Sequence, residues 1–193
     1  MSSASLDAGG LFVAVDVHYL DDVGARAAMV AARDRRFSLV SWTRTAVVAA
    51  VAPYQAGQFY LRELPPLRAV IPAPGEIALI VVDGYVDLDP GGRPGLGAHV
   101  HAEFGVPVIG VAKTAFKAAT HAAQVLRGRS SRPLYVTAAG MATADAARLV
   151  AEMTGQFRVP DALKLADRLA RGLELADDGS LAGASGDSVR SRR

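Results

Sequence analysis

Residues 80–84 read Ile-Val-Val-Asp-Gly, and residues 107–113 read Pro-Val-Ile-Gly-Val-Ala-Lys. Each is a short apolar run that ends in a charge, a pattern typical of strands buried on both faces of a sheet. Ligands of open α/β sheets bind just beyond the carboxyl ends of the strands, so Asp83 and Lys113 are candidates for chemistry. Lysine occurs at only three positions, 113, 117 and 164, and arginine supplies most of the positive charge. A lysine at a buried strand end in such a chain therefore indicates a functional ammonium group, and a structural salt bridge is the alternative.

Length and composition favour one globular domain. The chain has 193 residues, no cysteine and a net charge of +2. We expect a domain over residues 11–173, a flexible start over 1–10 and a disordered tail over 174–193. No apolar run approaches the roughly 18 residues of a membrane span, and the first residues lack a secretory pattern. We therefore expect a cytoplasmic monomer that does not bind membranes.

The apolar periodicity predicts an antiparallel meander followed by βα units, which gives a mixed α/β sheet flanked by helices. A polar turn over 34–36 joins the second and third strands, and Pro65 and Pro66 are expected to restart or kink the first helix. Thr143 is expected to cap a later helix. This order of elements resembles a ribonuclease H-like architecture. The expected strands are 11–17, 25–32, 37–51, 77–82, 108–112, 121–127 and 134–137, and the expected helices are 58–70, a segment ending at 104, 143–154 and 161–171.

Acidic residues occur where strands or a helix can bring them together. Asp16 lies inside the first predicted strand, on the face shared by Phe12 and Ala14. A buried carboxylate without a partner costs several kcal/mol, so Asp16 needs a cation, hydrogen-bond donors or an exposed strand end. Asp16 and Asp83 on adjacent strands would suit Mg²⁺, with Glu63 as a third acid and Lys113 stabilising charge. Alternatively, Asp16 bonds His18 or a backbone turn.

Glu63 also has an alternative, an ion pair with Arg62 or Arg68 in solvent. Asp167 borders an apolar helical stripe and can instead form an i,i+4 pair with Arg171.

Several short motifs follow one another in the order found in the endonuclease V family, which the chain therefore resembles. That family acts at deaminated adenine (inosine) in nucleic acid. It has an Asp on its first strand, a Pro-Tyr wedge, an Arg-Glu helix, an Asp-Gly strand end and a Gly-Val-Ala-Lys element. The corresponding segments here are 15–16, 53–54, 61–67, 82–84 and 110–113, with further similarities at 95–99, 133–136 and 165–167.

The resemblance implies a metal-dependent endonuclease of DNA repair that hydrolyses a phosphodiester near inosine in DNA or RNA. The metal would be Mg²⁺, for which Mn²⁺ can substitute, held by Asp16 and Asp83. The implied catalytic residues are Asp16, Glu63, Asp83, Lys113 and the auxiliary acid Asp167.

The resemblance also implies residues that bind nucleic acid. Pro53 and Tyr54 would form a wedge that opens the duplex, and Gly57, Gly84 and Leu96 would line a pocket for the extruded base. His99 would lie nearby. Alternatively, Tyr54 caps a core edge, the pocket residues only form turns and helix packing, and His99 packs or bonds within its helix.

The chain departs from the family pattern in its loops. Gln55 and Ala56 follow the wedge in place of a stiffer sequence, Asp89 replaces a histidine, and residues 91–92 contain an insertion. Fewer phosphate contacts should weaken binding. The alternative function is therefore a weakly active or inactive module that binds inosine-containing or single-stranded nucleic acid. A ribonuclease H-like phosphotransferase is a third possibility, but it requires a glycine-rich phosphate loop that residues 21–24 match poorly.

Overall fold

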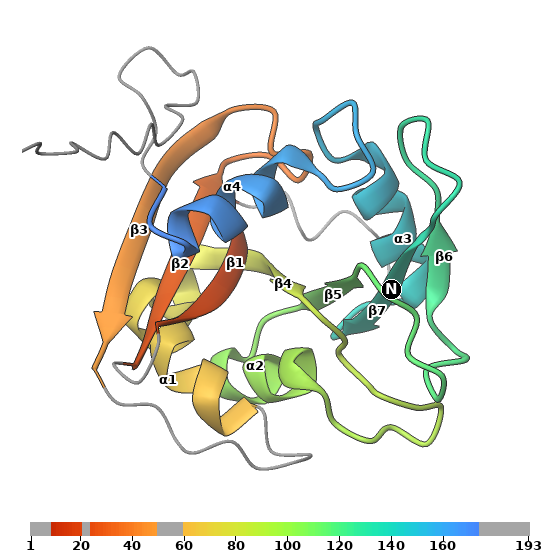
Figure 1. The fold of residues 1–193 in the computed structure, drawn as a ribbon, viewed down its shortest axis with the longest axis horizontal. Helices are drawn as coiled ribbons and strands as arrows, with labels where there is room; N and C mark the ends of the chain where they lie inside the picture. Colours follow the sequence, from red (N-terminus) through yellow and green to blue (C-terminus); the bar gives the residue numbers. More distant parts are fainter. Residues whose placement is uncertain (1–8, 21–23, 50–59, 174–193) are drawn as a thin grey trace, which may run out of the picture.

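The computed structural model describes residues 9–20, 24–49 and 60–173 of the chain (Figure 1). In this part of the chain, one mixed sheet has the strand order β3-β2-β1-β4-β5-β7-β6. β1, β2 and β3 pair antiparallel, β4 and β5 continue parallel to β1, and β7 pairs antiparallel with β5 and β6. The predicted meander followed by parallel strands is confirmed. The strands are β1 Leu11–Leu20, β2 Gly24–Ala32, β3 Val40–Val48, β4 Ile77–Asp83, β5 Val108–Ala112, β6 Ala123–Val125 and β7 Leu134–Ala139.

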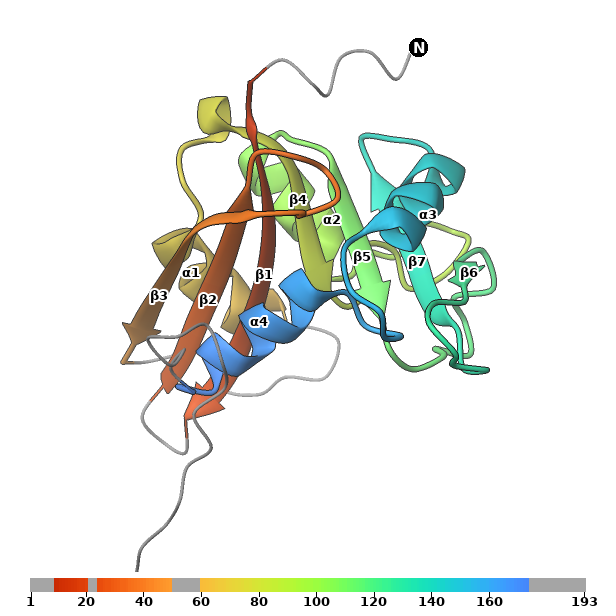
Figure 2. The ribbon, with the colours of Figure 1, turned by 90° about the horizontal axis from the view of Figure 1, so that it is seen from above.

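Helices cover both faces of the sheet. Figure 2 shows α1 (Tyr60–Val70) and α2 (Leu96–Phe104) on one side, and α3 (Thr143–Glu152) and α4 (Asp161–Ala170) on the other. A short 3₁₀ helix, Pro74–Glu76, precedes β4. No helix in the described ranges is long and apolar enough to cross a membrane.

Alternation along the central strands supplies both cores. On β1, Phe12 and Ala14 pack towards α3 and α4, whereas Val13 and Val15 pack towards α1 and α2. Residues with period two lie on opposite faces of a strand, so this continuous apolar run is buried from both sides. Asp16 therefore lies on the same face as Phe12 and Ala14, at the carboxyl end of the buried part of β1.

Several element boundaries differ from the prediction. The third strand begins at Val40 because Asp34 extends the preceding turn, accepting hydrogen bonds from the Arg36 and Ser38 N–H groups. Phe37 has a left-handed φ of 54° in this turn. β6 covers only Ala123–Val125 because a turn occupies the residues before it, with the Ala122 N–H bonded to the Ala119 carbonyl.

Two helix predictions differ in detail from the structure, because the first helix does not restart at its prolines and the predicted cap of α3 is itself helical. α1 continues as one helix through Pro65 and Pro66, where buried Pro66 packs with the apolar face of the helix. Thr143 is the first helical residue rather than the cap, because the Ala142 carbonyl already accepts bonds from the first turn. The predicted flexible start over 1–10 and disordered tail over 174–193 lie outside the described residues, apart from residues 9 and 10.

Candidate active site

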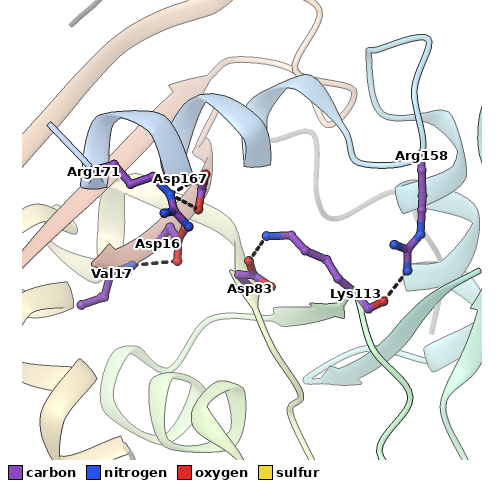
Figure 3. Close-up of polar contacts among 7 residues, drawn as sticks. All are labelled: Asp16, Val17, Asp83, Lys113, Arg158, Asp167 and Arg171. Atoms are coloured by element: carbon purple, nitrogen blue, oxygen red, sulfur yellow. Dashed lines mark hydrogen bonds and ion pairs between the residues drawn. The ribbon is translucent and has the colours of Figure 1, made fainter. Parts of the chain in front are cut away.

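Asp16 and Asp83 lie side by side at one edge of the sheet. β1 and β4 are parallel neighbours in which Ala14 pairs with Val81 and Val15 with Val82, so the next position in this register joins the two aspartates. Leu79 and Val81 pack on the face that also receives Ala14, which places Asp83 on the same face as Asp16. Figure 3 shows both carboxyl groups beneath α4. The predicted juxtaposition of the two aspartates on neighbouring strands is confirmed.

Asp16 is a partly buried acid whose polar contacts do not offset its loss of solvent. Burial raises its pKa to about 7, and repulsion from Asp83 contributes in the same direction. The Val17 N–H donates a 2.8 Å hydrogen bond to Asp16 Oδ1 and, with the charge of Lys113, opposes this shift. This donor lies within β1 and not in a turn, so the contact differs from the alternative of a bond to His18 or a backbone turn. A further cation would stabilise the ionised carboxyl group.

Glu63 faces these aspartates from α1. Glu63 is only 8% exposed, and burial raises the pKa of its carboxyl group to about 8. Repulsion from Asp16 adds to this shift, whereas a hydrogen bond from Tyr19 lowers it. The alternative of a solvent-exposed pair is wrong, because Glu63 is buried and Arg68 instead pairs with Glu103 at 2.5 Å.

Lys113 follows β5 and forms an ion pair with Asp83. Burial lowers the pKa of the Lys113 ammonium, but the hydrogen bond and charge of Asp83 more than offset this, and the net shift is upward. Asp16 and Asp167 act in the same direction. The ammonium therefore stays charged at neutral pH, at the position where two strand ends meet.

Asp167 reaches the site from α4. Arg171 Nε donates to both of its carboxylate oxygens at 3.0 Å, which is the i,i+4 pair considered as an alternative. The charge of Asp167 still raises the pKa of both Asp16 and Lys113, so it remains within electrostatic reach of them (Figure 3). Its auxiliary catalytic role stays a prediction.

The acids suit a small divalent cation that keeps much of its water. Among the described residues, no group of three or more acids or histidines is arranged to hold a metal. Asp16, Glu63 and Asp83 nevertheless line a hollow of about 10 Å³, which is close to the space that one water molecule needs. Mg²⁺ typically binds one or two carboxylates and retains several waters. Asp16 and Asp83 fit this requirement, and a cation there would relieve their repulsion.

A larger cavity of about 360 Å³ opens beside the acids. It includes Gly84 and Leu96, the two predicted pocket residues that lie in the described ranges. The motifs did not indicate its aromatic walls or Arg93, because these side chains come from loops and a helix start without periodic patterns. The lining residues are Tyr60, Glu63, Asp83, Gly84, Tyr85, Leu88, Arg93, Pro94, Gly95, Leu96 and Phe116.

Two glycines let the chain turn from the acids into this cavity. Gly84 has a φ of +138°, a conformation that L side chains rarely adopt. A Cβ at Gly110 on β5 would lie 2.7 Å from both the Gly84 carbonyl oxygen and the Val86 nitrogen. The segment after Asp83 therefore crosses β5 at a distance that only glycine permits.

His99 lies behind one wall of the cavity. Its ring stacks on Tyr60 with 3.5 Å between the centroids and 14° between the planes, and burial lowers its pKa. This is the packing alternative for His99, which does not belong to the cavity lining. Its nucleic-acid role stays a prediction. Pro53, Tyr54 and Gly57 lie outside the described residues.

Comparison with known proteins identifies one family across sequence and structure. Residues 3–129 match the family model described as Endonuclease V. An Endonuclease V from Azotobacter vinelandii is 32% identical over 83% of this chain and 82% of the relative. One from Streptomyces avermitilis is 30% identical over 84% of this chain and 80% of the relative.

Solved structures agree with the sequence matches. A crystal structure of the Streptomyces avermitilis Endonuclease V superposes with a TM-score of 0.67 and 28% identity, covering 84% of this chain and 80% of that one. A Ciona intestinalis Endonuclease V, crystallised with a 23-mer DNA containing an inosine followed by a ribo-adenosine, has a TM-score of 0.71 and 21% identity. That match covers 87% of this chain and 86% of the other. The predicted ribonuclease H-like fold is confirmed.

Proposed function

The chain belongs to the Endonuclease V family of nucleases, and we propose that it hydrolyses a phosphodiester near inosine in DNA or RNA with the help of Mg²⁺. The observation that carries this proposal is the position of the cavity relative to the acids. Asp83 and Glu63 line both the 360 Å³ cavity and the small hollow that includes Asp16. A base held in the cavity would therefore lie beside the groups that act on the phosphodiester.

Asp16 and Asp83 would hold the cation. A bound Mg²⁺ neutralises phosphate charge and lowers the pKa of water, which makes a hydroxide nucleophile accessible. The two carboxylates must be ionised to do this, and their mutual repulsion in the metal-free protein favours binding of a cation.

Lys113 and Glu63 would act on charge and protons. The Lys113 ammonium remains protonated and is directed towards the acids, so it stabilises the negative charge that develops as the phosphodiester breaks. Glu63 has a pKa of about 8, close to working pH, and can hold or release a proton beside the hollow. Asp167 would contribute an auxiliary negative charge.

The cavity would accept the extruded base. Tyr60, Tyr85 and Phe116 provide aromatic surface for stacking, and Arg93 brings a guanidinium group that suits the O6 and N7 acceptors of a 6-oxopurine. Extruding a base is cheapest at a mispaired site. Tyr54 and the adjacent Pro53 would assist by opening the duplex.

The decisive experiment compares cleavage of labelled oligonucleotides with inosine or adenosine at one position, as DNA and as RNA. Each substrate is incubated with and without Mg²⁺, and with Mn²⁺ as a substitute. We expect cleavage that requires both the metal and inosine. Binding of the inosine strand without cleavage under any metal condition would contradict the proposal and support a binding module.

A further inference from the structure

Lys113 stands at the start of an irregular segment rather than on a strand, because β5 ends at Ala112. A flexible lysine in such a loop has several rotamers and a mobile backbone to restrain. Given the proposed function, we propose that Tyr85 and Arg158 are positioning residues that hold Lys113 in place for phosphodiester cleavage. Neither residue belongs to the motifs that indicated the site.

Tyr85 links the segment after Asp83 to the segment after Lys113. Its hydroxyl donates a 2.8 Å hydrogen bond to the Thr114 carbonyl and accepts one of 3.0 Å from the Phe116 N–H. Burial raises the pKa of Tyr85, so the hydroxyl keeps the proton that it donates. One side chain therefore fixes the distance between the segment that follows Asp83 and the segment that follows Lys113.

Arg158 holds Lys113 from the opposite side. Its guanidinium donates to the Lys113 carbonyl and, at 2.7 Å, to the Pro133 carbonyl at the start of β7. Figure 3 shows Arg158 approaching the Lys113 backbone while the ammonium points away towards Asp83. The side chain and the backbone of the lysine are thus restrained by different partners.

A second arginine, Arg127, keeps Arg158 itself in position. Arg127 is 6% exposed and donates to the Phe157 carbonyl at 3.1 Å and to the Arg158 carbonyl at 3.3 Å. Its other bonds go to the Ala151 carbonyl in the last turn of α3 and to the Met153 and Gly155 carbonyls of the α3–α4 connection. This connection is therefore a fixed support, and Arg158 transmits its position to the Lys113 backbone.

Loss of these contacts should lower the cleavage rate, because a misplaced Lys113 charge stabilises the transition state poorly. Displacements of about 1 Å can cost about 10²-fold in rate when they disturb the reacting geometry. Tyr85 and Arg158 contact the lysine loop through backbone atoms, so their loss should alter its position without removing its charge.

The test measures single-turnover cleavage of an inosine substrate and its dissociation constant for two variants. Tyr85→Phe removes the hydroxyl but keeps the ring that lines the cavity, and Arg158→Met removes both carbonyl contacts. We expect each to lower the cleavage rate by about tenfold at nearly unchanged affinity. Tyr135→Phe is the matched control, because the Tyr135 hydroxyl makes no hydrogen bond within the described residues and β7 lies beside β5.

A double-mutant cycle identifies the route of the effect. Lys113→Met alone should lower the rate by about 10²-fold or more. If Tyr85 and Arg158 act through Lys113, their variants should cause no further loss in the Lys113→Met background. An equal loss in both backgrounds, or full activity of Tyr85→Phe, would overturn the inference.

Measuring the stability of each variant and the activity of the wild-type protein distinguishes these outcomes. If Arg158→Met does not fold, as thermal denaturation would show, Tyr85→Phe alone decides, because it deletes one oxygen atom. A wild-type protein that does not cleave inosine substrates contradicts the proposed function. Cleavage by wild type together with an unaffected Tyr85→Phe variant contradicts only the positioning role.

Discussion

The acids of the site and the acid in the loop after β4 differ in how well their charges are compensated. Asp16 at the end of the buried part of β1 is partly buried, and Glu63 faces it from α1 and is buried; nearby negative charge helps to raise their pKa values to about 7 and 8. In the loop after β4, Asp89 accepts hydrogen bonds from the Gly91 and Arg93 N–H groups and pairs with the Arg93 side chain at 3.3 Å. Asp16 has a partner in the Val17 N–H and Glu63 has one in Tyr19, but these do not offset burial and mutual repulsion, so both pKa values rise. This difference supports the proposed cation site beside the acids, whereas the loop after β4 satisfies its own polar groups and keeps a fixed shape.

The largest expected effect comes from the acids. Asp83→Asn or Asp16→Asn should reduce cleavage to background, because each removes a carboxylate that would hold the cation. The metal-free fold should remain, since either change also relieves repulsion between the two groups. Cleavage assays with Mg²⁺ and thermal denaturation of each variant measure both effects.

Asp145→Asn provides the control for this prediction. Asp145 lies exposed on α3, pairs with Arg148 and lines neither the cavity nor the hollow beside the acids. Its replacement should leave cleavage unchanged. Wild-type rates in Asp83→Asn would rule out the proposed metal site.

The second effect is a loss of stability of the metal-free protein as pH rises. Asp16 and Glu63 have folded pKa values of about 7 and 8 against ordinary values of 3.8 and 4.5. The folded chain therefore binds more protons than the unfolded chain between these values, and unfolding becomes easier as pH rises through that window. These groups contribute most stability below pH 4 and lose it by about pH 8, a change on the order of a few kcal/mol for each group.

Glu63→Gln tests that account directly. The amide cannot ionise, so the melting temperature of the variant should depend less on pH between 5 and 8 than that of wild type. At pH 8 the variant should melt above wild type without metal, and Mg²⁺ should raise the wild-type melting temperature. Parallel melting curves at every pH would show that Glu63 does not carry the effect.

The third effect concerns the wedge. Tyr54→Ala should weaken binding to inosine-containing duplex by about 1–3 kcal/mol, the value of one stacking contact. Single-stranded substrate should suffer less, because no strands need to be parted. Equal affinity of variant and wild type for intact duplex would exclude this role, and a titration with both substrate forms measures it.

Strand patterns predicted the acid edge because two geometrical rules are strict. Side chains alternate with period two, and the carboxyl ends of parallel strands meet at one edge, so Asp16 and Asp83 had few other places to lie. Register on β1 and β4 confirms this arrangement. Helix boundaries have weaker sequence signals. At α3 no side chain caps the first turn, and the Ala142 carbonyl accepts its hydrogen bonds, so Thr143 was not a reliable marker of the cap.

The cavity and the supports of Lys113 had no comparable sequence signal. Tyr85 and Phe116 lie in irregular segments, where no period relates a residue to its direction. Arg158 contacts the backbone of Lys113, 45 residues earlier in the chain. A bond to a carbonyl is available at every residue, so the partner's identity leaves no mark on the sequence.

The smallest expected effect separates an auxiliary acid from a surface ion pair at Asp167. Its side chain is 31% exposed and that of Arg171 52%, so their pair should contribute at most about 1 kcal/mol to stability. The match to the family model ends at residue 129, before Asp167. If its charge assists the metal, Asp167→Asn should lower the cleavage rate by less than about tenfold, an energy below about 1.4 kcal/mol.

Arg171→Gln distinguishes the two roles because it breaks the same pair from the other side. Removing the guanidinium frees the Asp167 carboxylate and increases the negative charge near Asp16, so an auxiliary acid should keep or gain activity in this variant. A purely structural pair predicts that both variants lose the same small amount of stability and keep the wild-type rate. Cleavage rates at subsaturating Mg²⁺, where added negative charge should improve binding of the cation most, provide the more sensitive comparison. A lower cleavage rate in Asp167→Asn together with an equal or higher rate in Arg171→Gln would therefore show that Asp167 assists Asp16 and Asp83. Wild-type rates in both variants would show that Asp167 only forms a surface ion pair.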